Sequence, residues 1–158
     1  HVLCIYVSGA QSRQLVGEFK GAIQDFSTAI ELTPNEAMRY YHRAVTYCEV
    51  DDCKNALMDL DNAILLSNES SPEILEARGS LLMYMSLSPK SEEYAMAIED
   101  LKLAVNVQPT LSSAHYKLGY LLREREQTKE SSYHLYQSMV HSPTFARIDT
   151  LATELALL

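Results

Sequence analysis

Residues 22–34, AIQDFSTAIELTP, hold the pattern that decides the fold. A small residue, a large apolar residue and a second small residue are spaced so that they share one face of a helix, and a proline follows. The pattern occurs four times, as Ala22, Phe26, Ala29 and Pro34; Ala56, Leu60 and Ala63; Ala97, Leu101, Ala104 and Pro109; and Ser131, Leu135, Ser138 and Pro143. The first two copies are 34 residues apart, as are the last two. A fixed period of this size predicts an array of repeated structural units.

A second apolar helix is predicted ahead of each copy. Its large residues also surround one small residue, which lets a neighbouring helix approach closely. These sets are Tyr6 and Ala10; Tyr40, Ala44 and Tyr47; Leu75, Gly79 and Leu82; and Leu118, Gly119 and Leu122. Each repeat therefore consists of two amphipathic helices, which we call helix A and helix B.

The chain resembles the tetratricopeptide repeat (TPR) family over nearly its whole length. GEFKGAI at residues 17–23 and AIELTP at residues 29–34 are similar to the family's turn and second helix, and Leu118-Gly119 is similar to its Leu-Gly pair. The chain departs from the family pattern in lacking tryptophan, in Asn68 where proline is expected, and in Ser131 and Ser138 where alanines are expected. The resemblance implies an all-α, right-handed α-solenoid of four helix-turn-helix repeats plus a C-terminal helix.

The repeats are expected near residues 3–36, 37–70, 72–111 and 112–145, within a single domain that covers residues 1–158. The predicted helices are 3–15, 19–32, 37–50, 53–67, 72–85, 92–107, 112–126 and 129–141, with a ninth at 145–157 that caps the array or begins a further repeat. Because the chain opens on an apolar segment without methionine, we expect it to be a fragment of a longer protein.

The third repeat is longer than the others. Ala56 and Ala97 are 41 residues apart rather than 34, and most of the extra residues fall in SLSPKSE at 86–92. Turn-forming and polar residues dominate this segment, so it is interpreted as a tolerated surface loop between helices A and B. The alternative interpretation is an edge contact to a neighbouring subunit.

Composition and charge exclude several classes of function. The chain has a net charge of −8 without a basic stripe, so we expect no nucleic-acid binding. It has no apolar run long enough for membrane insertion. Three cysteines without metal-ligand spacing favour a reducing, cytoplasmic (intracellular) location. Catalytic, phosphate-binding and metal-binding motifs are absent from the sequence, so we expect a non-enzyme without cofactor or metal.

The family resemblance implies a concave groove lined by the A helices, which holds extended peptides or partner helices. Its spacing selects ten candidate groove residues: Met38, Tyr41, Val45, Glu73, Glu76, Met83, Tyr84, Tyr116, Tyr120 and Arg123. Tyrosine provides amphipathic contact area and methionine adapts to irregular partners. We therefore expect a protein or peptide partner with apolar anchors and some basic residues, the latter near the two glutamates.

Other interpretations apply to some of these residues. Glu73 and Glu76 can equally be solvated acids that stabilise the first turn of a helix. Tyr6, Tyr40 and Tyr47 occupy the family's packing positions rather than its groove positions. A carboxylate clamp for the acidic tails of chaperones is excluded, because the matching positions lack its basic and amide residues.

Three functional hypotheses follow. The favoured one is a protein–protein interaction scaffold that binds a peptide in the groove, or along its flank within a multiprotein assembly. The second is a substrate-recruiting arm of an enzyme whose catalytic domain lies outside this fragment. The third is self-association through the apolar C-terminal helix, which carries Leu151, Leu155 and Leu158.

Overall fold

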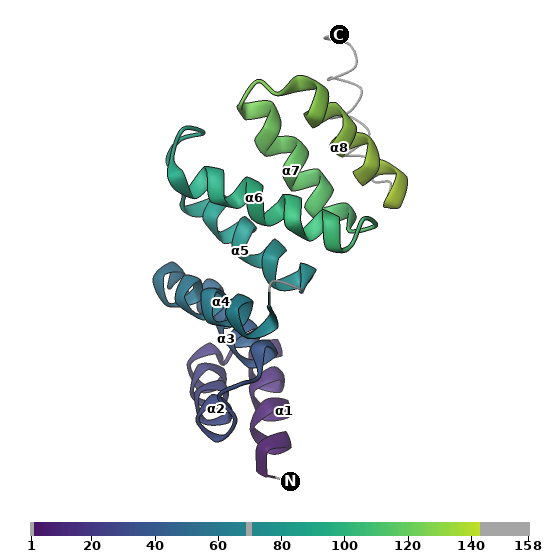
Figure 1. Ribbon diagram of the computed structural model, residues 1–158. Helices are drawn as coiled ribbons and strands as arrows, with labels where there is room; N and C mark the ends of the chain where they lie inside the picture. The colour runs from purple at the N-terminus through teal and green to yellow at the C-terminus, as the bar shows by residue number, and fades with distance from the viewer. Residues whose placement is uncertain (1, 69–70, 143–158) are drawn as a thin grey trace. The chain divides into compact units, whose positions relative to one another are not determined.

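The computed structural model describes residues 2–68 and 71–142, with side chains from residue 6 onward. These residues form eight helices and no strand (Figure 1): α1 Val2–Leu15, α2 Phe19–Leu32, α3 Ala37–Glu49, α4 Cys53–Ser67, α5 Pro72–Met85, α6 Glu92–Val107, α7 Ser112–Glu124 and α8 Thr128–His141. The all-α class and the eight helices predicted within this range are confirmed. The helix predicted at 145–157 lies outside the described residues. None of the described helices is both long and apolar enough to cross a membrane.

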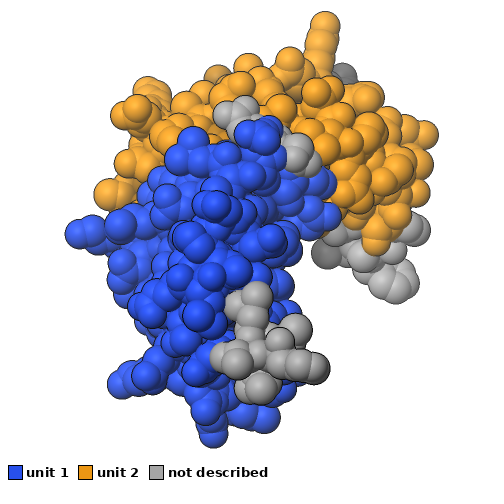
Figure 2. All heavy atoms as spheres, turned by 60° about the horizontal axis from the view of Figure 1, so that its bottom comes forward, with its two compact units in different colours: residues 1–77 blue, residues 78–158 orange. Residues whose placement is uncertain are grey.

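The chain divides into two compact units, which Figure 2 colours separately. Unit 1 comprises residues 1–77 and holds α1 to α4 with the start of α5. Unit 2 comprises residues 78–158 and holds the rest of α5 with α6, α7 and α8. In unit 1, α1 packs on α2, α2 on α3 and α3 on α4; in unit 2, α6 packs on α7 and α7 on α8.

The repeated pattern forms the interface between helices A and B in every repeat. The large residues Phe26, Leu60, Leu101 and Leu135 are at most 1% exposed. The small residues on either side of them in the B helices are fully buried. Burial of this kind is the main stabilising contribution in a solenoid, because each repeat contacts only its neighbours.

Two glycines allow close helix approaches in repeats three and four. A Cβ atom on Gly119 of α7 would lie 2.8 Å from Cγ of Leu135 on α8. On Gly79 of α5 it would lie 3.0 Å from Cγ of Leu101 on α6. Repeats three and four therefore use glycine where repeats one and two have Ala10 and Ala44 at the corresponding position.

The two serines that replace alanine in α8 are accommodated differently. The hydroxyl of Ser131 is buried and donates a hydrogen bond of 2.9 Å to the carbonyl of Gly119. The buried hydroxyl of Ser138 has no hydrogen-bond partner among the described residues. Burial of a polar group without a partner is unfavourable, so Ser138 stabilises the fourth repeat less than alanine would.

Three of the turns between helices A and B share one backbone conformation. Gly17, Asp51 and Glu126 have φ angles of 81°, 60° and 61°. The amide of the next residue then donates to a carbonyl five residues earlier, as in the bond of 2.9 Å from Gln127 to Leu122. These turns end α3 and α7 at Glu49 and Glu124, slightly before the predicted ends at 50 and 126, because a left-handed residue cannot continue a right-handed helix.

Replacing Glu126 by glycine is expected to stabilise the protein. A side chain in the left-handed region costs about 1–2 kcal/mol relative to glycine, partly offset by the greater freedom of glycine in the unfolded chain. We expect Glu126→Gly to raise the free energy of unfolding by about 1 kcal/mol, measured by urea denaturation. Glu126→Ala is the control, since it removes the carboxylate but keeps the strained backbone. An equal gain from both variants would assign the effect to charge instead.

The insertion of the third repeat is tied to the fourth. Arg125, in the turn after α7, donates a hydrogen bond of 2.9 Å from Nε to the carbonyl of Pro89. The Tyr94 hydroxyl donates one of 3.1 Å to the carbonyl of Leu121, and burial raises the pKa of Tyr94 to about 12, so the donor keeps its proton. The Arg125 guanidinium also lies 5.5 Å from the centre of the Tyr94 ring. The surface loop predicted from the sequence is therefore anchored; its role as a contact to another subunit stays a prediction.

A polar pair also joins helices A and B in every repeat. The B-helix member always precedes the large buried residue of the pattern. The pairs are Arg13–Asp25 at 3.0 Å, Arg43–Asp59 at 2.7 Å, Arg78–Asp100 at 2.7 Å and His115–His134 at 2.9 Å. The first three are ion pairs and the fourth pairs two imidazoles, a difference that separates the last repeat from the others.

Candidate functional site

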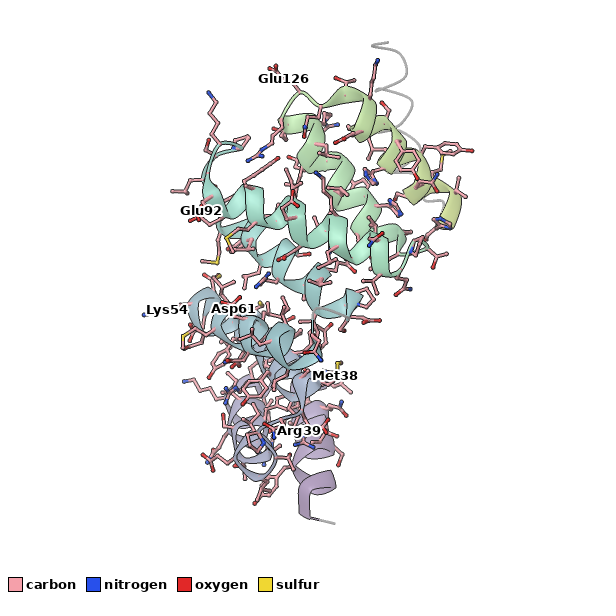
Figure 3. The ribbon with its side chains drawn as sticks, in the orientation of Figure 1. Met38, Arg39, Lys54, Asp61, Glu92 and Glu126 are labelled. Carbon is pink, nitrogen blue, oxygen red and sulfur yellow. The ribbon has the colours of Figure 1, made fainter. Side chains whose placement is uncertain are left out.

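Three of the candidate residues lie along α3 in unit 1. Met38, Tyr41 and Val45 are spaced so that they share a helix face. Met38 is 43% exposed, and Tyr41 and Val45 are partly exposed. Figure 3 labels Met38 at the start of this helix, beside Arg39. Arg39 has a structural role instead, because its Nη1 donates 2.8 Å to the carbonyl of Thr33 at the end of α2.

The two candidate glutamates at the start of α5 act on Tyr41. Burial raises the pKa of Tyr41, and the negative charges of Glu76 and Glu73 raise it further. The hydroxyl of Ser71 donates a hydrogen bond of 3.0 Å to Oε2 of Glu73. Unit 1 thus brings a neutral phenol and two carboxylates together, which we call the Tyr41 cluster. Its field favours a cationic group placed near the tyrosine.

The neighbouring tyrosines have a packing role. The guanidinium of Arg43 lies 5.9 Å from the ring centres of both Tyr40 and Tyr47. Both rings are only partly exposed. They flank the partly buried Arg43–Asp59 pair, which agrees with their expected packing positions.

The remaining five candidates lie in unit 2, on α5 and α7. Tyr84 is 70% exposed and Tyr120 is 39% exposed, while Met83, Tyr116 and Arg123 are partly exposed. The guanidinium of Arg123 lies 5.1 Å from the centre of the Tyr120 ring, a cation–π arrangement. Arg123 Nε also lies 3.9 Å from Oε1 of Glu124.

Met83 and Tyr120 line an open hollow of about 280 Å³. The other lining residues come from the insertion and its surroundings: Ser86, Leu87, Ser88, Pro89, Tyr94 and Glu124. Leu87 is 99% exposed. Sequence reasoning did not assign this hollow, although an apolar leucine within an otherwise polar insertion was a usable signal. We call it the insertion hollow.

The ten candidates thus form two sets of five, one in each unit. Within unit 1, Glu73 and Glu76 act on Tyr41; within unit 2, Met83 and Tyr120 share the insertion hollow. A single groove lined by all ten stays a prediction. Among the described residues, no three His, Cys, Asp or Glu side chains are placed to hold a metal ion.

The fold is that of the tetratricopeptide repeat, and the predicted resemblance is confirmed by similarity to proteins of that name. The chain is 38% identical over 96 residues to tetratricopeptide repeat protein 36 of Danio rerio, covering 59% of this chain and 48% of that protein. It therefore spans about half the length of that curated relative. No model of a known protein family matches the chain.

Solved structures share the fold at low sequence identity. The crystal structure of MamA superposes with a TM-score of 0.83 at 19% identity, covering 97% of this chain and 80% of that one. YrrB, described as a TPR protein with an unusual peptide-binding site, superposes with a TM-score of 0.78 at 19% identity, covering 96% of this chain and 75% of that one. At this identity the likeness concerns the fold alone.

Proposed function

We propose that this chain is a protein–protein interaction scaffold that binds a peptide segment of its partner, extended or helical, through the A-helix surfaces. The observation that carries the proposal is the Tyr41 cluster, where a partly exposed tyrosine lies in the field of Glu73 and Glu76. Such a surface suits a peptide that places a lysine or arginine beside an apolar side chain.

Charge and exposure support this choice of partner. Residues 35–71 contain three basic and seven acidic side chains, and residues 72–111 contain three and six. The exposed side chains of Met38 and Tyr84 add apolar contact area in their respective units. An acidic peptide would be repelled by this charge, so the scaffold does not act as a carboxylate-clamp binder of chaperone tails.

A TPR protein among the structural neighbours, YrrB, carries a peptide-binding site according to its description. The same fold can therefore serve peptide recognition, which supports a scaffold rather than a catalytic domain. Recruitment of substrates to an enzyme elsewhere in a longer chain would use the same surface. Leu151, Leu155 and Leu158, the basis of the self-association hypothesis, lie outside the described residues.

The test is selection of binders from a random peptide library displayed on phage, with the 158-residue chain as bait. We expect selected peptides to combine lysine or arginine with aromatic or aliphatic residues. Synthetic versions should then bind the Glu73→Gln/Glu76→Gln variant at least tenfold more weakly, measured by isothermal titration calorimetry at low salt.

The matched control removes two other exposed acids of unit 1. The Glu31→Gln/Glu36→Gln variant changes the net charge equally but leaves the Tyr41 cluster intact. If both variants bind the peptides equally weakly, the loss of affinity comes from overall charge and not from the Tyr41 cluster. Selected peptides that are acidic, or that bind the cluster variant unchanged, would overturn the proposed site.

A further inference from the structure

The polar pair that joins helices A and B has a different chemistry in the last repeat than in the other three. Repeats one to three close this position with an arginine–aspartate pair, and repeat four closes it with two imidazoles whose Nδ1 atoms lie 2.9 Å apart. Carboxylate and guanidinium groups keep their charges between about pH 5 and pH 7.5, whereas imidazole titrates within this range.

The geometry assigns the protons of the neutral pair. Nε2 of His115 lies 3.0 Å from the carbonyl of Pro109. Since a carbonyl only accepts, His115 carries its proton on Nε2 and leaves Nδ1 as an acceptor. His134 must then donate from Nδ1 to His115. This bond joins α7 to α8 and requires an unprotonated Nδ1 on His115.

The surroundings resist protonation of the pair. His115 is 4% exposed. Burial lowers the pKa of His115; the Pro109 carbonyl opposes this effect and His141 adds to it. Burial, then the charges of His115 and Lys102, lower the pKa of His134 to about 4.

Among the described residues, the other titratable groups around the pair lie on α6 and α8. Lys102 lies on α6 and His141 on α8. Tyr133 also lies on α8, with its ring centre 5.0 Å from that of His134. The two that act electrostatically on the pair, Lys102 and His141, are cationic when charged and oppose added positive charge. No carboxylate contributes to the shifts of either imidazole.

We propose that the His115–His134 pair is an acid-sensitive latch, which holds α8 on α7 at neutral pH and releases it as the pH falls toward 5. Protonating His115 at Nδ1 would place two N–H groups against each other and a positive charge beside the His134 ring. Opening the fourth repeat exposes both imidazoles to water, where they accept protons freely. Acid therefore favours the open form, while the ion-paired repeats keep their closing contacts.

The sign and size follow from proton linkage. An imidazole with an ordinary pKa near 6.5 in the open state and a lowered one in the closed state favours closure above pH 6.5 and opposes it progressively below. The opening equilibrium constant rises about tenfold per pH unit for each proton taken up. Between pH 7.5 and pH 5, one such proton increases opening by about thirtyfold.

Hydrogen–deuterium exchange of the 158-residue chain tests the latch. After correction for the intrinsic pH dependence of exchange, we expect protection of α7 and α8 amides to fall by about thirtyfold from pH 7.5 to pH 5. Amides of α1, which the Arg13–Asp25 pair joins to α2 and which carries no histidine, should change less than threefold. Equal loss in all repeats, or none in α7 and α8, would overturn the proposal.

Two variants connect the response to the pair. His134→Gln keeps an N–H donor for His115 without a titrating ring at position 134, and we expect it to reduce the acid response to the part that comes from His115. His141→Gln, at an exposed position, should keep most of the response, because His141 is the smallest of the three influences on the pKa of His115. An unchanged response in His134→Gln, or its loss in His141→Gln, contradicts the assignment.

A measurement on the unmutated chain covers the case in which His134→Gln does not fold. The ring proton resonances of His115 and His134, followed by NMR, should titrate below the ordinary imidazole value of about 6.5 or lose intensity as the repeat opens. Ordinary titration near pH 6.5 with α7 and α8 still protected would overturn the latch.

Discussion

Arg43→Ala is expected to destabilise unit 1 by about 3–5 kcal/mol, because it leaves a buried carboxylate without its partner. Both guanidinium nitrogens that face Asp59 contribute, with bonds of 2.7 and 2.8 Å from Nε and Nη2. Nη1 donates a further bond of 2.9 Å to the hydroxyl of Ser27 on α2. Asp59 is only 4% exposed, so water cannot replace these donors. The free energy of unfolding from urea denaturation measures the loss.

The control is the apolar double variant Arg43→Met/Asp59→Leu. Removing both charges leaves no unpaired group, and such replacements are often neutral or stabilising. We expect the double variant to be more stable than Arg43→Ala by at least about 2 kcal/mol. If the two variants are equally unstable, the arginine contributes through packing on Tyr40 and Tyr47 rather than through its charge.

Phe26→Ala is expected to cost about 3–5 kcal/mol, the usual loss for truncating a buried aromatic side chain. Phe26 is fully buried between Ala22 and Ala29, and its ring stacks on that of His42 on α3 with centres 5.8 Å apart. It therefore joins α2 both to its own repeat and to the next one. Thermal unfolding followed by circular dichroism should show a lower midpoint.

The chain provides its own control for this position. The other three repeats have leucine where the first has phenylalanine. Phe26→Leu should therefore cost less than about 2 kcal/mol, since a leucine of similar shape fits the same interface. A leucine variant as unstable as the alanine variant would show that the aromatic stack on His42, rather than the apolar volume, stabilises α2.

The sequence was sufficient to predict the helices, because their positions depend on a periodic pattern. Every described helix begins and ends within two residues of its prediction, and the large residues of the pattern are buried. α3 and α7 end early because the left-handed residues Asp51 and Glu126 follow them, and α1 and α8 each begin one residue before the predicted start. Side-chain volume and spacing determine helix packing, whereas a single backbone torsion determines where a turn begins.

The B-helix residues of the four polar pairs occupy the same place in every repeat of the sequence, but the pattern did not identify their partners. Asp25, Asp59, Asp100 and His134 precede the large residue of each pattern. Their partners lie on helix A at positions that are not all equivalent, so periodicity alone did not reveal the pairs. Leu87, apolar within a polar insertion, was a signal for the insertion hollow, but the shape of the hollow depends on how one non-repeating loop is anchored, which the sequence pattern does not give.

For the candidate site, the sequence placed residues on helices correctly but did not determine their neighbours. The effect of Glu73 and Glu76 on Tyr41 depends on the distance between α3 and the start of α5. Exposure and charge describe which kind of ligand a surface favours. The binding roles of the candidate residues are tested by the peptide experiments proposed above.

The anchored insertion changes how folding spreads along the chain. In a linear array, the cooperativity between neighbouring repeats depends on the energy of the interface that joins them. The bonds from Arg125 to Pro89 and from Tyr94 to Leu121 add to one such interface only, between the third and fourth repeats. A longer loop usually makes an array easier to unfold piecemeal, but at neutral pH, where the His115–His134 bond also holds α8 on α7, this one should make its two repeats melt as one block.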